Sequence, residues 1–165
     1  WLEQAGLINK VLLSKAPKLP LKAYDDLGTF KLYTLDLGLL RRLSELDASI
    51  LLLPTPAYTE YKGALAENYI LQSLTAQFQM PFRYWASGNK AEVDFLLQYA
   101  NQIYPIEVKA DQNIQGKSLI QYEKLFQPTC RIRYSMLNLK RDGNLLNIPL
   151  FLADKTKELL GVVSD

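Results

Sequence analysis

The sequence feature that most constrains the fold is a pair of alternating segments on either side of Ala100–Asn101. Residues 91–98 and 102–110 alternate apolar and polar side chains, as half-buried strands do. The two residues between these segments are enough for the tight loop of a β-hairpin. The sequence therefore predicts an antiparallel hairpin within a sheet.

A two-residue loop also fixes which residues face each other across the hairpin. It places Phe95 opposite Ile106 and Val93 opposite Val108. These apolar pairs are predicted to share one face of the sheet, with the charged pairs on the other face. This agreement between register and polarity supports the pairing.

The charged face of the hairpin is the unusual part. Asp94 is predicted to lie opposite Glu107, and Glu92 opposite Lys109 in a surface ion pair. Two facing carboxylates with Cβ atoms roughly 4.5–5.5 Å apart repel each other. A divalent cation between Asp94 and Glu107 would turn this cost into a binding site. Lys109 lies two residues after Glu107, so both side chains should point the same way.

A further acid comes from the predicted helix over residues 61–79. Glu67 shares a stripe with Ile70, Leu74 and Phe78, at spacings of three, seven and eleven residues. A carboxylate on such a buried stripe is either paired or functional. The open alternatives are a site residue and a helix carboxylate bonded to Lys109 or to a backbone amide.

Helical and strand patterns on either side complete the predicted α/β architecture. The elements follow the order α-β-β-β-α-β, with a further edge strand near the end that contains Pro149. In residue ranges, these are a helix over 61–79, strands over 82–86, 91–98 and 102–110, a helix over 116–126, and strands over 130–137 and 147–152.

The first 52 residues have a different character. We expect the end of a helix closed by Gly6, short strands over 11–13 and 30–35, and a short helix with Asp36 as its N-cap. This order is typical of the back half of a winged helix, although a small antiparallel appendage fits it too. Prolines in Leu53–Pro56 favour a boundary, which divides the chain into 1–52 and 53–165.

Composition excludes several kinds of chemistry. The chain of 165 residues contains no histidine and one cysteine, so it cannot build a Ser-His-Asp triad, a histidine-ligated metal site or an intrachain disulfide. Any bound metal should be an oxygen-preferring cation such as Mg²⁺ or Mn²⁺. The net charge of +2 is too small to indicate a polyanion-binding surface by itself.

The ends and apolar runs of the chain bear on its location. No apolar run is long enough for a membrane span, and the N-terminus lacks the pattern of a signal peptide. We therefore expect a cytoplasmic protein without a membrane partner. Its start at Trp1 instead of Met favours a fragment of a longer protein.

The site residues and element order resemble those of the PD-(D/E)XK nuclease-like superfamily. Its signature is a helix glutamate (here Glu67), an aspartate on the second core strand (Asp94) and Glu-x-Lys on the third (Glu107 to Lys109). The resemblance implies a restriction-endonuclease-like core. It also implies that Asp94, Glu107 and the carbonyl of Val108 are metal ligands, that Lys109 is the catalytic lysine, and that Glu67 is an accessory acid.

Nearly the whole chain also resembles the C-terminal module, originally a domain of unknown function, of a prokaryotic family of AAA-type ATPases. The segments that support this resemblance are residues 31–40, 63–68, 84–95 and 105–109, together with the late Ile148-Pro149-Leu150. It implies a P-loop ATPase domain upstream, joined by a winged helix whose tail is the first forty or so residues of this chain. This chain contains no Walker-type Gly-Lys-Ser/Thr, so ATP should bind only to that upstream domain.

Three functional interpretations follow. The first is a Mg²⁺- or Mn²⁺-dependent endonuclease-like domain that acts on DNA phosphodiesters. The second is a nuclease fold that no longer cuts and instead binds nucleic acid or docks a partner. The third is a structural module for oligomerisation.

Overall fold

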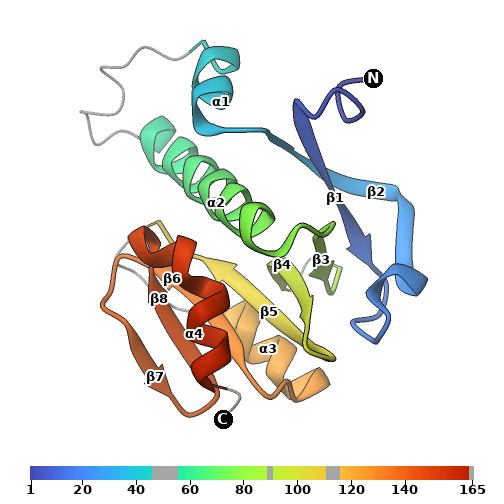
Figure 1. Cartoon of the computed structure of the whole chain (residues 1–165), viewed down its shortest axis with the longest axis vertical. Coiled ribbons are helices and arrows are strands. Elements are labelled where there is room, and N and C mark those ends of the chain that lie inside the picture. Colours follow the sequence, from blue (N-terminus) through green and yellow to red (C-terminus); the bar gives the residue numbers. More distant parts are fainter. Residues whose placement is uncertain (46–55, 89–90, 111–115, 164–165) are drawn as a thin grey trace.

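The computed structural model describes residues 1–45, 56–88, 91–110 and 116–163 (Figure 1). Its elements in chain order are β1 (Ile8–Ser14), the 3-10 helix η1 (Leu21–Tyr24), β2 (Asp25–Thr34), α1 (Leu37–Leu43), α2 (Pro56–Phe78), β3 (Arg83–Ala86), β4 (Glu92–Tyr99), β5 (Gln102–Val108), α3 (Lys117–Phe126), β6 (Arg131–Ser135), β7 (Lys140–Asp142), β8 (Leu145–Pro149), the 3-10 helix η3 (Leu150–Lys155) and α4 (Thr156–Val163). Within these residues, no helix has the length and apolar character needed to cross a membrane.

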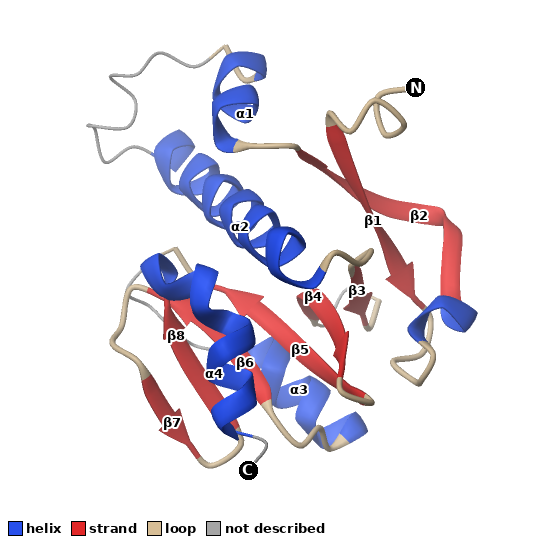
Figure 2. Ribbon diagram, in the orientation of Figure 1, coloured by secondary structure: helices blue, strands red, loops and turns tan. Residues whose placement is uncertain are grey.

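The strands form one mixed sheet of eight strands in the order β2-β1-β3-β4-β5-β6-β8-β7. Helices α2 and α4 cover one face of this sheet and α3 covers the other (Figures 1 and 2). The order α2-β3-β4-β5-α3-β6 confirms the predicted α-β-β-β-α-β succession and the mixed α/β class.

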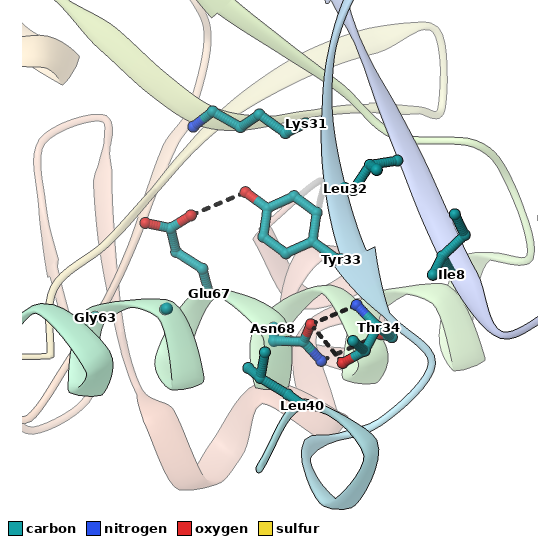
Figure 3. Close-up of a pocket in the computed structure, with 10 residues that line it drawn as sticks. Ile8, Lys31, Leu32, Tyr33, Thr34, Leu40, Gly63, Glu67 and Asn68 are labelled. Atoms are coloured by element: carbon teal, nitrogen blue, oxygen red, sulfur yellow. Dashed lines mark hydrogen bonds between the residues drawn. The ribbon is translucent and has the colours of Figure 1, made fainter. Parts of the chain in front are cut away.

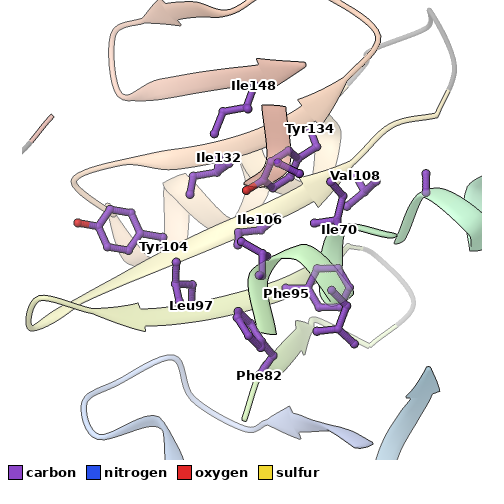
Figure 4. Packing of buried hydrophobic residues seen from close by; sticks show 14 of the residues in the cluster. Ile70, Phe82, Phe95, Leu97, Tyr104, Ile106, Val108, Ile132, Tyr134 and Ile148 are labelled. Carbon is purple, nitrogen blue, oxygen red and sulfur yellow. The ribbon is translucent and has the colours of Figure 1, made fainter. Parts of the chain in front are cut away.

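Two groups of buried side chains hold the layers together. The main core lies between the sheet and α2, where Ile70 packs near Phe95, Ile106 and Ile132 (Figure 4). The second core lies between the sheet and α3, where Trp85 meets Tyr122 edge to face with ring centroids 5.3 Å apart. Both faces of β4 and β5 are therefore buried, and any polar group on them lies in a costly environment.

The N-terminal residues confirm several local predictions. The amide of Leu7 donates to the carbonyl of Leu2, and that of Gly6 donates to Glu3, with Gly6 at a φ of +71°. These two bonds form a Schellman motif. Asp36 caps α1, since its carboxylate accepts a hydrogen bond from the amide of Leu39.

The two N-terminal strands belong to the same sheet as the rest of the chain. β1 pairs with β2 in antiparallel fashion and with β3 in parallel, and a buried ion pair between Asp25 on β2 and Arg83 on β3 spans β1. The predicted boundary near residue 53 lies outside the described residues. The 1–52 segment supplies two strands, β1 and β2, to the common sheet.

The C-terminal region differs from the prediction. The strand that contains Pro149 was predicted at an edge, but β8 lies between β6 and β7. Proline is accommodated because it is the last residue of β8, and β7 pairs only with 145–147. The short edge strand β7, η3 and α4 were not predicted, since the first has three exposed residues and no apolar alternation.

The turn of the central hairpin offers a test of local strain. Ala100 and Asn101 both have positive φ, 48° and 58°, as a type I′ turn requires. Alanine is poorly suited to this region because its Cβ approaches the following carbonyl oxygen. We expect the double change Ala100→Asn and Asn101→Gly to raise the free energy of unfolding by about 1 kcal/mol. Urea denaturation measures this change, and a loss of stability would contradict the turn geometry.

Candidate functional site

The register of the β4–β5 hairpin confirms the prediction over most of its length. The pairs run from Tyr99 and Gln102 at the turn to Phe95 and Ile106, with the predicted partners throughout. Regular pairing ends at Phe95, the residue that follows Asp94, so the predicted pairs of Asp94 with Glu107 and of Val93 with Val108 are not part of the ladder.

Beyond this point the Asp94 side chain takes part in joining the two strands. Its Oδ2 accepts a hydrogen bond from the backbone N–H of Val108 at 2.7 Å. The carboxylate is therefore fixed against the β5 backbone next to Glu107. The backbone of Asp94 itself does not pair with Glu107 in the ladder.

The predicted division of apolar and charged pairs between the two faces is wrong at Val93. Phe95 and Val108 pack in the main core under α2, whereas Val93 packs in the second core with Trp85. The cause is an irregularity in the β3–β4 pairing between Arg83 and Trp85, which breaks the alternation along β4. Asp94 lies at this switch, between a residue that faces α3 and one that faces α2.

The surroundings of Asp94 disfavour its charged form. Burial, followed by the negative charge of Glu67, raises the pKa of Asp94 to about 7. The Val108 amide and the charge of Lys31 oppose this rise, and Glu107 adds to it. The structure thus brings both Glu67 and Glu107 within electrostatic range of Asp94.

Glu107 is the most deeply buried acid of the site, with 2% of its side chain exposed. Its Oε1 lies 3.1 Å from Lys109 Nζ, so the two side chains point the same way, as predicted. Its Oε2 is buried and accepts no hydrogen bond from any residue that the structure describes. A buried carboxylate oxygen without a partner is costly and marks a place for a positive ligand.

A second cation lies near Glu107 from the neighbouring strand. Arg133 on β6 is in register with Glu107, and its Nε donates to Asn147 at 3.0 Å. Burial lowers the pKa of Arg133, while the charge of Glu107 opposes this effect. Lys109 and Arg133 together supply part of the charge that balances Glu107.

The predicted ion pair between Glu92 and Lys109 does not form. Glu92 instead binds Lys31 on β2, and Lys109 binds Glu107. Strands β1 and β3 lie between β2 and β4 in the sheet, and the ammonium of Lys31 lies 5.0 Å from the centre of the Tyr84 ring on β3, from where it reaches Glu92 at the start of β4.

Glu67 occupies the predicted buried stripe of α2. Ile70 and Leu74 on the same stripe are fully buried, and Glu67 itself is half-buried. Its Oε2 accepts a hydrogen bond from the hydroxyl of Tyr33 at 2.8 Å (Figure 3). Glu67 is therefore paired, but with neither of the two partners that the sequence suggested.

A cleft of about 580 Å³ opens beside Glu67, between β2, α1 and α2. Lys31 and Tyr33 line one wall, while Gly63 and Ala64 line another together with Glu67 (Figure 3). This cleft gives Glu67 access to solvent, but Asp94, Glu107 and Lys109 are not among the residues that line it.

Sequence reasoning missed Lys31 and Tyr33 as site residues. Both belong to the segment 31–40 that supports the family resemblance, but nothing local shows their role. Their partners, Glu92 and Glu67, are 61 and 34 residues away in the sequence. Only the sheet topology brings them together.

The donor set of the site suits a hard cation, but it is small. Within the described ranges, no group of three or more acidic, histidine or cysteine side chains could hold a metal ion. A cation would therefore depend on Asp94, Glu107 and a backbone oxygen such as that of Val108. Oxygen ligands of this kind fit Mg²⁺ or Mn²⁺, and the unpartnered Oε2 of Glu107 is where positive charge is lacking.

Comparison with known proteins places the chain in one family. Neither the curated proteins nor the solved structures gave a match. The family model described as "Domain of unknown function (DUF4143)" matches residues 62–151, which is more than half of the chain and includes most of α2 and the β3–β6 strands of the site. The chain therefore belongs to the family of this domain of unknown function, DUF4143.

Proposed function

We propose that this chain is a divalent-metal-dependent nuclease-like domain that acts on DNA phosphodiesters. Asp94, Glu107 and the carbonyl of Val108 would hold Mg²⁺ or Mn²⁺. The observation that supports this most directly is the buried, unpartnered Oε2 of Glu107 beside an Asp94 whose pKa is raised. These two carboxylates lack positive charge in a way that a divalent cation would correct.

The other residues have roles that suit phosphodiester hydrolysis. When bound, the cation would polarise the scissile phosphate and lower the pKa of an attacking water. Lys109 holds its ammonium 3.1 Å from Glu107, where it can stabilise negative charge that develops on the phosphate. Glu67, half-buried on α2, is the accessory acid and faces the open cleft.

The element order and the four site residues support a restriction-endonuclease-like core. The resemblance over nearly the whole chain further supports a place in the C-terminal part of a larger AAA-type ATPase, with ATP bound only by its upstream domain. The ATPase domain would then regulate access to DNA, and this chain would supply the chemistry.

The competing function is an inactive nuclease fold that binds DNA or a partner without cutting. The ion pair between Lys109 and Glu107, with Arg133 in register, favours this alternative, because it balances part of the site charge without a metal. The two proposals differ in whether Glu107 is needed for a chemical step.

Cleavage assays with Mn²⁺ separate the two proposals. Plasmid, linear and single-stranded DNA are incubated with the protein, and we expect a cleavage product in at least one case. Glu107→Gln should lower the cleavage rate more than about 100-fold. Loss of a metal ligand should exceed the roughly 10- to 100-fold effect that is typical of residues that only hydrogen-bond to a ligand. Glu158→Gln, a change at an exposed glutamate of α4, is the control and should leave cleavage unchanged.

Two other outcomes decide against the leading proposal. Retardation of DNA on a gel, without cleavage by the unaltered protein, would support the binding module. Cleavage that persists in Glu107→Gln would show that another site or a contaminant is responsible.

A further inference from the structure

The hydrogen bond between Tyr33 and Glu67 joins the N-terminal strands to the candidate site. Tyr33 lies on β2 with 8% of its surface exposed, and its hydroxyl donates to Glu67 Oε2 at 2.8 Å (Figure 3). Burial, the negative charge of Glu67 and this hydrogen bond all raise the pKa of Tyr33. The hydroxyl therefore stays protonated and remains a donor over the whole physiological pH range.

The position of Tyr33 is fixed on both sides. Its ring packs on Phe95 of β4, with centroids 5.4 Å apart. The next residue, Thr34, is bound by Asn68 of α2, which accepts from the Thr34 amide at 2.9 Å and donates to its carbonyl at 3.2 Å. Two adjacent residues of β2 thus hold two adjacent residues of α2, namely Glu67 and Asn68.

Glu67 needs such a partner to remain at the site. Its charge and that of Asp94 interact unfavourably, as the raised pKa of Asp94 shows. The cleft beside Glu67 offers space into which its flexible side chain could turn away from this repulsion. A hydrogen bond from a rigid donor opposes that movement.

Lys31 provides positive charge from the same strand. It lies two residues before Tyr33, so both side chains project from the same face of β2. Burial lowers the pKa of Lys31, but its bond to Glu92 and the charges of Glu67, Glu92 and Asp94 raise it on balance. One strand therefore brings both a hydrogen-bond donor and a cation to the acids of the site.

We infer that Tyr33 is a positioning residue of the candidate site, which holds the Glu67 carboxylate beside Asp94 while Lys31 balances the charge of these acids. This inference rests on the proposed function. It makes β2 an integral part of the site, although β2 lies outside the α-β-β-β-α-β core and outside the matched residues 62–151.

A double-mutant cycle on the full chain tests the inference. Tyr33→Phe removes only the hydroxyl and should lower kcat for Mn²⁺-dependent DNA cleavage about tenfold, with KM for DNA unchanged within about twofold. If Tyr33 acts through Glu67, then Tyr33→Phe should cause no further loss in a protein that already carries Glu67→Gln.

The control is Tyr134→Phe, which removes another buried tyrosine hydroxyl, that of a main-core residue bonded to Thr156 at the start of α4. It should lower the melting temperature about as much as Tyr33→Phe and leave kcat unchanged.

Each contrary result has a separate meaning. Rate losses of Tyr33→Phe and Glu67→Gln that multiply, or a Tyr33→Phe protein with unchanged kcat, would overturn the positioning role while the nuclease proposal stands. If the unaltered protein neither cleaves DNA nor binds Mn²⁺, the proposed function is wrong, and the positioning role falls with it.

Discussion

Replacing Asp94 by asparagine is expected to abolish metal-dependent cleavage and at the same time to stabilise the metal-free protein near neutral pH. In the unaltered chain the Val108 N–H donates to Asp94 Oδ2 at 2.7 Å, and the amide oxygen of asparagine can still accept this hydrogen bond. The negative charge that burial and Glu67 disfavour is removed. We expect the free energy of unfolding at pH 8 to rise by about 1–3 kcal/mol.

The same residue predicts how stability depends on pH. The pKa of Asp94 is about 7 in the folded chain and 3.8 in its ordinary state. Between these values the folded state holds a proton that the unfolded state has lost, so stability falls as pH rises from about 4 to 7. Urea denaturation of the metal-free protein should show this decline, and Asp94→Asn should reduce it. Asp142→Asn, at an exposed position on β7, is the control and should leave the decline in place.

An Asp94→Asn protein that is less stable than the unaltered chain at pH 8, or that keeps the full pH dependence, would contradict this description of Asp94. It would mean that the carboxylate is already balanced within the folded chain and has no need of a cation.

Breaking the buried ion pair between Asp25 and Arg83 is expected to lower the free energy of unfolding more than any of the other substitutions proposed for this chain. Arg83 Nε and Nη2 donate to the two carboxylate oxygens of Asp25 at 2.9 Å each, and Nη1 donates to the carbonyl of Pro81 at 2.8 Å. The two side chains are 8% and 9% exposed. Removing the carboxylate leaves a buried guanidinium without its counter-charge, which costs about 3–5 kcal/mol.

A short series of variants measures this effect. Asp25→Ala should lower the free energy of unfolding by that amount, and the double change Asp25→Ala with Arg83→Met should cost less than Asp25→Ala alone. The control is Glu158→Ala, which breaks an exposed ion pair with Lys155 and should cost less than about 0.5 kcal/mol. A cost below 1 kcal/mol for Asp25→Ala would show that the pair does not hold β2 to the core.

This ion pair also matters for the site. It ties the start of β2 to β3, while Asn68 ties the end of the same strand to α2. Tyr33 and Lys31 therefore project from a strand that is anchored at both ends. Loss of either anchor should disturb the acids of the site as well as the sheet.

Much of the architecture could be predicted because it is determined by local patterns. The β4–β5 register followed from a two-residue loop and from alternation, and the caps at Gly6 and Asp36 followed from residue type. The contact between Lys109 and Glu107 needed only their spacing on one strand.

The rest depends on contacts between distant segments. The irregularity that turns Val93 toward α3 results from the pairing of β4 with β3, which alternation within β4 does not reveal. The partners of Glu67 and Glu92 come from β2, and that strand reaches them only because β1 joins the sheet beside β3. β7 has three exposed residues and no apolar alternation from which to predict it, whereas α4 has an amphipathic helical pattern that the sequence prediction missed.

The central claim is that Asp94 and Glu107 bind a divalent cation, and anomalous diffraction from crystals soaked in Mn²⁺ tests it most directly. We predict an anomalous peak within bonding distance of the carboxylates of both Asp94 and Glu107, and no such peak in Asp94→Asn crystals. Crystals of the unaltered protein that show no peak between these two residues, with Glu107 still bound only to Lys109, would contradict the claim.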